Sequence, residues 1–190
     1  MFKIQVSERI VEHCKRQIQL YNFGQRRTAN GTPEQQLTGN IGQCAIMEKF
    51  GLDLIDGADG CDDGQDINFK GLVVDVKTMG RTVDVRPDFV NNFISLQLRF
   101  NTDLYIFCSL NKRNNELTIC GWIPKSEFLQ KASLYPEGTI RTRTDGSTFK
   151  TFADLYEIKN RDLYDVNSFE ELTKSIEDHY HKSGAEGSQP

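Results

Sequence analysis

The sequence predicts a mixed α/β fold in which a central mixed β-sheet is flanked by helices. Two observations lead to this prediction. Helical segments with capping signals occupy most of the first 50 residues. Several short segments between residues 66 and 123 carry the apolar alternation, or the continuous apolar character, of β-strands. Elements in this order are typical of a sheet with helices packed against it.

Each predicted helix begins at a recognisable signal. Ser7 caps the first helix, whose apolar residues fall on one stripe. Thr32 caps the second helix, which carries proline in its first turn and ends before Gly51. Pro124 begins a short helix, and Ser168 opens a capping box that starts the last one.

Alternation and apolar runs predict the strands. Residues 93–100 alternate between apolar and polar side chains, and residues 104–110 are almost continuously apolar, which indicates a central strand. The predicted strands are residues 66–69, 72–78, 93–100, 104–110, 117–123 and 155–158.

The composition fits one globular domain. The chain has 190 residues, 37% apolar and 26% charged, and we expect a single domain over residues 1–182 with a disordered tail at 183–190. No apolar stretch approaches the roughly 20 residues that cross a membrane. The N-terminus lacks the charged-then-apolar pattern of a signal peptide. We therefore expect a cytoplasmic protein with no membrane partner.

Several classes of site are excluded by their motifs. The five cysteines are scattered and form no C-x-x-C pair, so neither a zinc ribbon nor a disulfide framework is expected. The sequence has no P-loop and no G-x-G-x-x-G motif, so we expect no nucleotide cofactor. The acidic, glycine-rich segment 57–66 does not match a calcium-binding EF-hand loop, because Lys70 stands where that loop needs a glutamate.

One strand carries two charges among valines. In residues 72–78 (LVVDVKT), alternation places Asp75 and Lys77 on one face and Val74 and Val76 on the other. Burying a carboxylate and an ammonium is costly unless the two groups are paired or used. The strand is therefore a chemical site, or it holds a structural ion pair, or it lies at an edge with its polar face in water.

A second carboxylate is expected beside this strand. Asp66 precedes Asp75 by nine positions, and Gly71 provides a turn between them, so a hairpin would bring the two carboxylates together. Mg²⁺ prefers oxygen ligands and usually takes one or two carboxylates together with water and substrate phosphate. Lys77 could then hold the attacking water or stabilise charge on the phosphorus.

These residues resemble the signature of a known family. Asp66, Asp75, Val76 and Lys77, in the spacing D-x8-D-V-K, resemble the signature of the PD-(D/E)XK, or restriction-endonuclease-like, nuclease superfamily. The resemblance implies a core of αβββαβ type and hydrolysis of phosphodiester bonds with Mg²⁺ or Mn²⁺, most simply by a DNA endonuclease. It makes Asp66 and Asp75 metal ligands, the Val76 carbonyl a third ligand, and Lys77 the catalytic lysine.

Neighbouring segments extend the resemblance. Residues 39–51 (GNIGQCAIMEKFG) resemble the first core helix of the family, and residues 103–109 and 121–125 resemble the strands that follow its catalytic hairpin. The resemblance covers roughly residues 32–130.

The sequence departs from the family pattern at two positions. Gln65, not proline, precedes Asp66. Gln43 stands where many members carry a glutamate that binds metal or water, and an amide oxygen can ligate without supplying negative charge. Glu48 falls in the apolar stripe of the same helix and is the second candidate for this role.

The resemblance implies DNA as the partner. Two basic pairs, Arg26 with Arg27 and Arg141 with Arg143, are candidates for phosphate contacts, although the formal net charge of the chain is −4. Many members of the family act as dimers, which makes a homodimer a second candidate partner. Two rival hypotheses stay open: a non-catalytic DNA-binding or assembly module with a degraded site, and an enzyme of other chemistry in which the Asp–Lys pair is only a buried ion pair.

Overall fold

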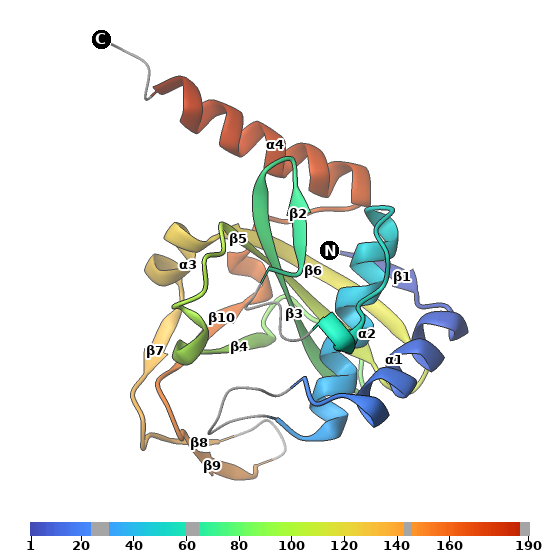
Figure 1. Ribbon diagram of the computed structural model, residues 1–190. Coiled ribbons are helices and arrows are strands. Elements are labelled where there is room, and N and C mark those ends of the chain that lie inside the picture. The colour runs from blue at the N-terminus through green and yellow to red at the C-terminus, as the bar shows by residue number, and fades with distance from the viewer. Residues whose placement is uncertain (24–30, 60–64, 143–145, 187–190) are drawn as a thin grey trace.

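A five-stranded mixed sheet forms the centre of the molecule (Figure 1). The computed structural model describes residues 1–23, 31–59, 65–142 and 146–186. The strand order is β1-β6-β5-β3-β2, with β3 and β5 parallel and all other neighbours antiparallel. The strands are β1 (Phe2–Gln5), β2 (Ile67–Phe69), β3 (Leu72–Arg81), β5 (Leu104–Asn111) and β6 (Glu116–Pro124). The predicted mixed sheet is thereby confirmed.

Helices α1 (Glu8–Leu20) and α2 (Pro33–Lys49) lie against one face of this sheet (Figure 1). The predicted caps are present: the Ser7 hydroxyl accepts from a backbone N–H of the first turn, and Thr32 forms a capping box. Contact between α2 and β3 is close at Gly42, where a Cβ would lie 1.9 Å from Thr78 Oγ1.

Helix α4 (Phe169–Glu186) packs across one end of the sheet, where the Trp122 indole donates to Ser175 Oγ at 3.1 Å. The far end of this helix projects from the body (Figure 1). No helix within the described ranges is long and apolar enough to cross a lipid bilayer.

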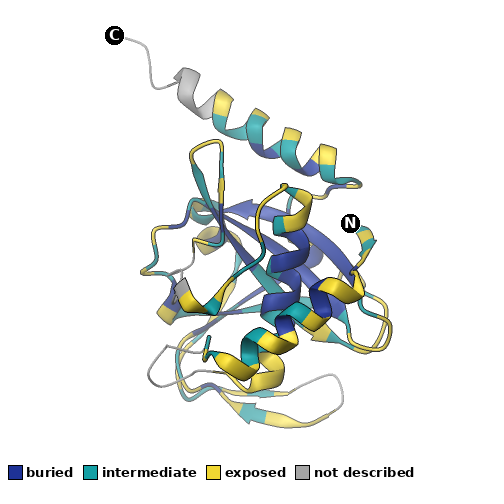
Figure 2. Ribbon diagram, turned by 45° about the vertical axis from the view of Figure 1, so that its right-hand side comes forward, coloured by how far each residue is buried: buried dark blue, intermediate teal, exposed yellow. Residues whose placement is uncertain are grey.

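A second, smaller sheet covers the opposite face. Its antiparallel strands have the order β4-β10-β7. With α3 it encloses a second apolar core around Phe93, Phe107 and Phe128, and Figure 2 shows the buried centre between the layers. The elements are β4 (Val90–Ile94), α3 (Lys125–Lys131), β7 (Ser133–Tyr135) and β10 (Leu155–Lys159).

The remaining elements lie at the periphery. Strands β8 (Ile140–Thr142) and β9 (Thr148–Lys150) pair as a separate ribbon, at the bottom of Figure 1. In the described part of the chain, short 3-10 helices connect larger elements: η1 (Gly57–Asp59), η2 (Ser95–Gln97) and η3 (Asn160–Asp162).

The strands differ from those predicted at two places. The predicted strand 93–100 ends at Ile94, where the chain turns into η2, and β4 belongs to the second sheet. No strand was predicted for the N-terminal residues, which form edge strand β1 against β6. Helix α4 is described to Glu186, and residues 187–190 lie outside the described residues, so the expected disordered tail stays a prediction.

Candidate functional site

Asp75 and Lys77 of β3 form the predicted pair. Lys77 Nζ lies 2.5 Å from Asp75 Oδ1, and the side chains are 16% and 2% exposed, respectively. The ammonium also lies 5.7 Å from the centre of the Phe93 ring on β4. Both charges therefore face the second sheet, whereas Val74 and Val76 face the core under α2.

The hairpin brings Asp66 opposite Asp75. β2 and β3 pair with Ile67 opposite Val74, so the next position in this register places Asp66 opposite Asp75. Residues directly opposite each other in an antiparallel pair point to the same face. Asp66 Oδ2 accepts a hydrogen bond of 2.6 Å from the backbone N–H of Val76. The structure thus gathers Asp66, Asp75 and Lys77 just beyond the Ile67–Val74 pair, the last residue pair that β2 and β3 form.

The Val76 carbonyl faces the same edge. The N–H and C=O of one strand residue point to the same side of the strand, and the Val76 N–H points at Asp66. Two carboxylates and one carbonyl are hard oxygen donors, which fit Mg²⁺ when water and phosphate complete its shell. No group of three or more His, Cys, Asp or Glu side chains with the arrangement of a metal site occurs within the described ranges. A Mg²⁺ ion at Asp66 and Asp75 would therefore also need the Val76 carbonyl, water and substrate phosphate as ligands.

Helix α2 places its two candidates differently. The Glu48 carboxylate accepts from Arg9 of α1 at 2.7 Å, and this ion pair is exposed to solvent. Gln43 lies about 140° from Glu48 around the helix, next to Gly42, which packs on Thr78. Because Thr78 and Asp75 point to opposite faces of β3, Gln43 can approach the carboxylates only around the open edge of that strand. Glu48 is engaged with α1.

The one candidate DNA-contact residue that is described has a partner. Arg141 donates to Glu157 Oε2 at 2.7 Å, and its guanidinium lies 3.7 Å from the centre of the Tyr135 ring. The hydrogen bond to Glu157 raises the pKa of Arg141 and joins its guanidinium to β10. Arg26, Arg27 and Arg143 lie outside the described residues.

Sequence reasoning missed Tyr105, which lies beside Asp75. β3 and β5 are parallel, and their register pairs Asp75 with Tyr105. The Tyr105 side chain is buried, and burial together with the charge of Asp75 raises its pKa. The segment 104–110 signals a central strand, but no local pattern indicates which residue of β3 lies next to Tyr105.

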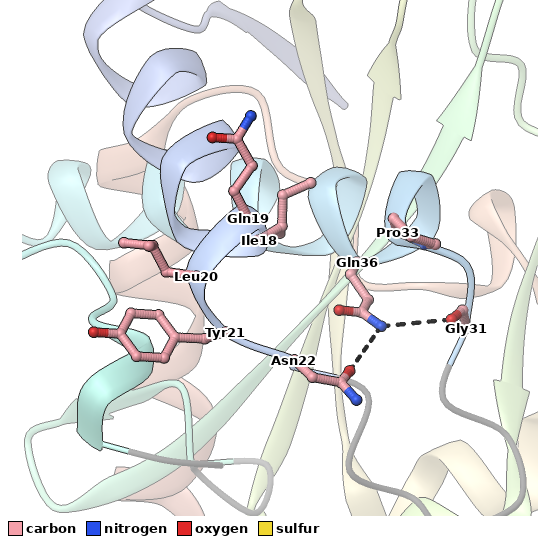
Figure 3. Close-up of a pocket in the computed structure, with 8 residues that line it drawn as sticks. All are labelled: Ile18, Gln19, Leu20, Tyr21, Asn22, Gly31, Pro33 and Gln36. Carbon is pink, nitrogen blue, oxygen red and sulfur yellow. Dashed lines mark hydrogen bonds between the residues drawn. The ribbon is translucent and has the colours of Figure 1, made fainter.

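A shallow pocket lies elsewhere, between the end of α1 and the start of α2 (Figure 3). Its volume is about 470 Å³. Gln36 spans part of it, donating to Asn22 Oδ1 at 3.1 Å and to the Gly31 carbonyl at 3.5 Å. The described lining is mostly amide and aliphatic and contains no carboxylate, so we assign no chemistry to this pocket.

Comparison of the chain with protein-family models, with curated proteins and with solved structures gave no significant match. The arrangement of the site is therefore the basis for inferring the class of protein. That arrangement consists of two carboxylates opposite each other across a hairpin, with a lysine two residues beyond the second carboxylate.

Proposed function

We propose that this protein is a metal-dependent nuclease of the PD-(D/E)XK type, which hydrolyses phosphodiester bonds of DNA as an endonuclease. The observation that supports the proposal most is the register of the β2–β3 hairpin, which places Asp66 opposite Asp75 beside Lys77. An αβββαβ core belongs to the same proposal. Helix α2 and strands β2 and β3 follow one another along the chain, and β5 joins the same mixed sheet beside β3.

The site residues divide the work between them. Asp66, Asp75 and the Val76 carbonyl would hold Mg²⁺ or Mn²⁺. When bound, this cation supplies Lewis-acid polarisation of the scissile phosphate and a water of lowered pKa. Lys77 leaves Asp75, turns toward the phosphate and orients the attacking water or stabilises the charge that develops on the phosphoryl oxygens. Gln43 would add a neutral oxygen from α2 if it reaches around the strand edge.

Burial decides how substrate reaches this site. The Asp75 side chain is only 2% exposed, and Lys77 covers it with a side chain that is itself 16% exposed. Asp66 is half-buried and lies just beyond the last residue pair that β2 and β3 form within the described ranges. In the proposed reaction, DNA therefore approaches from the Asp66 edge, and Lys77 moves outward to meet the phosphate.

Asp66 and Asp103 offer a matched pair of variants for the test. Each carboxylate accepts one backbone N–H of β3: Asp66 from Val76 at 2.6 Å, and Asp103 from Val73 at 2.7 Å. Only Asp66 lies opposite Asp75 in the hairpin register. Asparagine at either position keeps an oxygen that can accept the same hydrogen bond, but it removes the negative charge.

The experiment incubates supercoiled plasmid and end-labelled linear DNA with the protein, with Mg²⁺, Mn²⁺ or EDTA. The proposal expects nicked or linear plasmid with either metal, no product with EDTA, and a loss of about 100-fold or more in Asp66→Asn. Asp103→Asn should retain activity within a few-fold. Equal losses in both variants, or no cleavage by the wild-type chain, contradict the proposal.

One observation favours a second candidate, in which the Asp–Lys pair serves the fold alone. The 2.5 Å contact and the near-complete burial of Asp75 are also what a structural ion pair requires. In that case the chain cuts no DNA. Binding of DNA without cleavage, measured by fluorescence anisotropy at two salt concentrations, would identify a non-catalytic binding module.

A further inference from the structure

Arg81 ends β3 on the face of the strand that carries Asp75 and Lys77. Side chains alternate along a strand, and the unbroken register of β3 with β5 from Val74 to Arg81 keeps the Arg81 side chain on the side of the second sheet. Its guanidinium donates to the carbonyl of Val90, the first residue of β4, at 2.6 Å. Arg81 therefore joins the end of β3 to the start of β4.

No carboxylate pairs with the Arg81 cation among the residues that the structure describes. Two other cations on this side of the sheet do have such a partner: Lys77 has Asp75, and Arg141 has Glu157. The Arg81 side chain is half-buried, and its Nε is buried without a hydrogen-bond partner. Burial lowers the pKa of Arg81, and removing a cation from water without supplying an anion costs free energy. A bound anion would offset this cost.

A second guanidinium lies close to that of Arg81. The Cζ atoms of Arg81 and Arg86 lie 4.9 Å and 4.7 Å from the centre of the Phe89 ring, so the two cations are within about 10 Å of each other. Like charges at this separation repel. Arg86 pairs with Asp88 at 3.4 Å, but both side chains are well exposed, so a ligand can replace this contact. Guanidinium groups present forks of N–H donors that match the oxygens of a phosphate.

We propose that Arg81 and Arg86 form a phosphate-binding subsite, which takes a backbone phosphate of DNA other than the scissile one. The inference rests on the proposed function for the identity of the ligand. Arg81 lies four residues beyond Lys77 on the same strand face, which is roughly 13 Å along the strand. Each strand of B-DNA carries one phosphate per about 3.4 Å of helix axis. A duplex with one phosphate at Lys77 therefore has others within reach of Arg81.

Fluorescence anisotropy of a labelled DNA duplex in EDTA measures this subsite without cleavage. Arg81→Met should weaken binding roughly 10-fold, and Arg86→Met should weaken it by a few-fold or more. Each variant should also reduce the slope of log affinity against log salt by about 1, because one phosphate contact is lost. Arg81→Lys keeps the charge but not the fork, so it should keep the slope and recover part of the affinity. Unchanged affinity and slope in Arg81→Met overturn the proposal.

Arg16→Met is the matched control for the loss of one positive charge. Arg16 is exposed on α1, which lies against the other face of the sheet (Figure 1). Its removal should leave the affinity and the salt slope nearly unchanged, and a loss equal to that of Arg81→Met would overturn the subsite. Arg86→Met decides the case in which Arg81→Met does not fold, because the Arg86 side chain is 60% exposed. Unchanged DNA affinity in Arg86→Met then overturns the proposal.

Inorganic phosphate and the plasmid assay separate this inference from the proposed function. Calorimetric binding of inorganic phosphate that depends on Arg81, with DNA affinity independent of Arg81, would assign the subsite to a small phosphate ligand and overturn the assignment to DNA. A wild-type chain that binds no DNA in EDTA overturns it as well. Binding of DNA that depends on Arg81, without cleavage, supports the subsite and contradicts the nuclease. Equal cleavage of sub-saturating plasmid by wild type and Arg81→Met supports the nuclease and overturns the subsite.

Discussion

The Asp75–Lys77 pair leads to a quantitative prediction about stability. Lys77→Met removes the ammonium and leaves a carboxylate that is only 2% exposed. Removing one partner of a buried ion pair costs roughly 3–5 kcal/mol, because the remaining charge is uncompensated. Since the Lys77 side chain is 16% exposed, we expect the lower part of this range, about 3 kcal/mol. For a chain of this length that corresponds to a fall of about 6–12 °C in thermal midpoint.

A matched variant on the surface sets the scale. Arg9 and Glu48 form an ion pair of similar length, 2.7 Å against 2.5 Å for Asp75 and Lys77, but their side chains are 66% and 41% exposed. Solvent screens such a pair, so Arg9→Met should cost at most about 1 kcal/mol. The double variant Asp75→Asn with Lys77→Met should recover most of the loss caused by Lys77→Met alone, because it removes the buried negative charge together with the ammonium.

Urea unfolding followed by tryptophan fluorescence measures these differences. Trp122 is the single tryptophan and is fully buried, so its emission reports loss of the central core. If Lys77→Met costs no more than Arg9→Met, the pair is not desolvated and the reasoning from burial is refuted. The same result would remove the physical basis for treating these two charges as exceptional.

Three further predictions follow from the description of the site and its support. Glu48→Gln should retain DNA cleavage and change the free energy of unfolding by at most about 1 kcal/mol, because Glu48 forms an exposed ion pair with Arg9. A loss of cleavage as large as that of Asp66→Asn would show that Glu48 belongs to the catalytic site. Gly42→Ala should cost about 1–3 kcal/mol in urea unfolding, because the new Cβ would lie 1.9 Å from Thr78 Oγ1; an unchanged midpoint would show that α2 does not pack this closely on β3. Arg141→Met should lower the free energy of unfolding in urea and leave DNA affinity nearly unchanged, because the partner of Arg141 is Glu157. A large loss of DNA affinity, measured by fluorescence anisotropy, without a loss of stability would show that Arg141 contacts phosphate.

Local chemistry made part of the fold predictable. Ser7 and Thr32 mark their helices because a cap acts within four residues of itself. The pairing of Asp66 with Asp75 follows from a turn at Gly71, where φ is +86°, a conformation that favours glycine. These features depend on neighbours in sequence, so a single chain contains the information needed to infer them.

The failures come from long-range packing. Alternation in residues 93–100 predicted one strand, yet Leu96 is 38% exposed and Gln97 is buried at 6%, the reverse of the predicted faces. The chain leaves the strand there because the Ser95 N–H donates to the Asp154 carbonyl, and Leu98 closes a turn onto Ser95. A partner about 60 positions away cannot be read from an alternation pattern.

The site shows the same division between local and distant information. The ion pair of Asp75 with Lys77 was predictable because side chains two apart on a strand share a face. The engagement of Glu48 by Arg9, that of Arg141 by Glu157, and the position of Tyr105 beside Asp75 each depend on elements distant in sequence. Helical periodicity grouped Glu48 with the apolar residues of α2, but it could not indicate that the Glu48 carboxylate pairs with Arg9 of α1.

The most direct test of the central claim is an anomalous difference map from crystals of the chain grown with Mn²⁺. The proposed site predicts a peak between the carboxylates of Asp66 and Asp75, about 2.1–2.2 Å from an oxygen of each, with Lys77 turned away from Asp75. The peak should disappear in Asp66→Asn and persist in Asp103→Asn. A map with no peak at the hairpin, and Lys77 still bound to Asp75 at saturating Mn²⁺, would contradict the account.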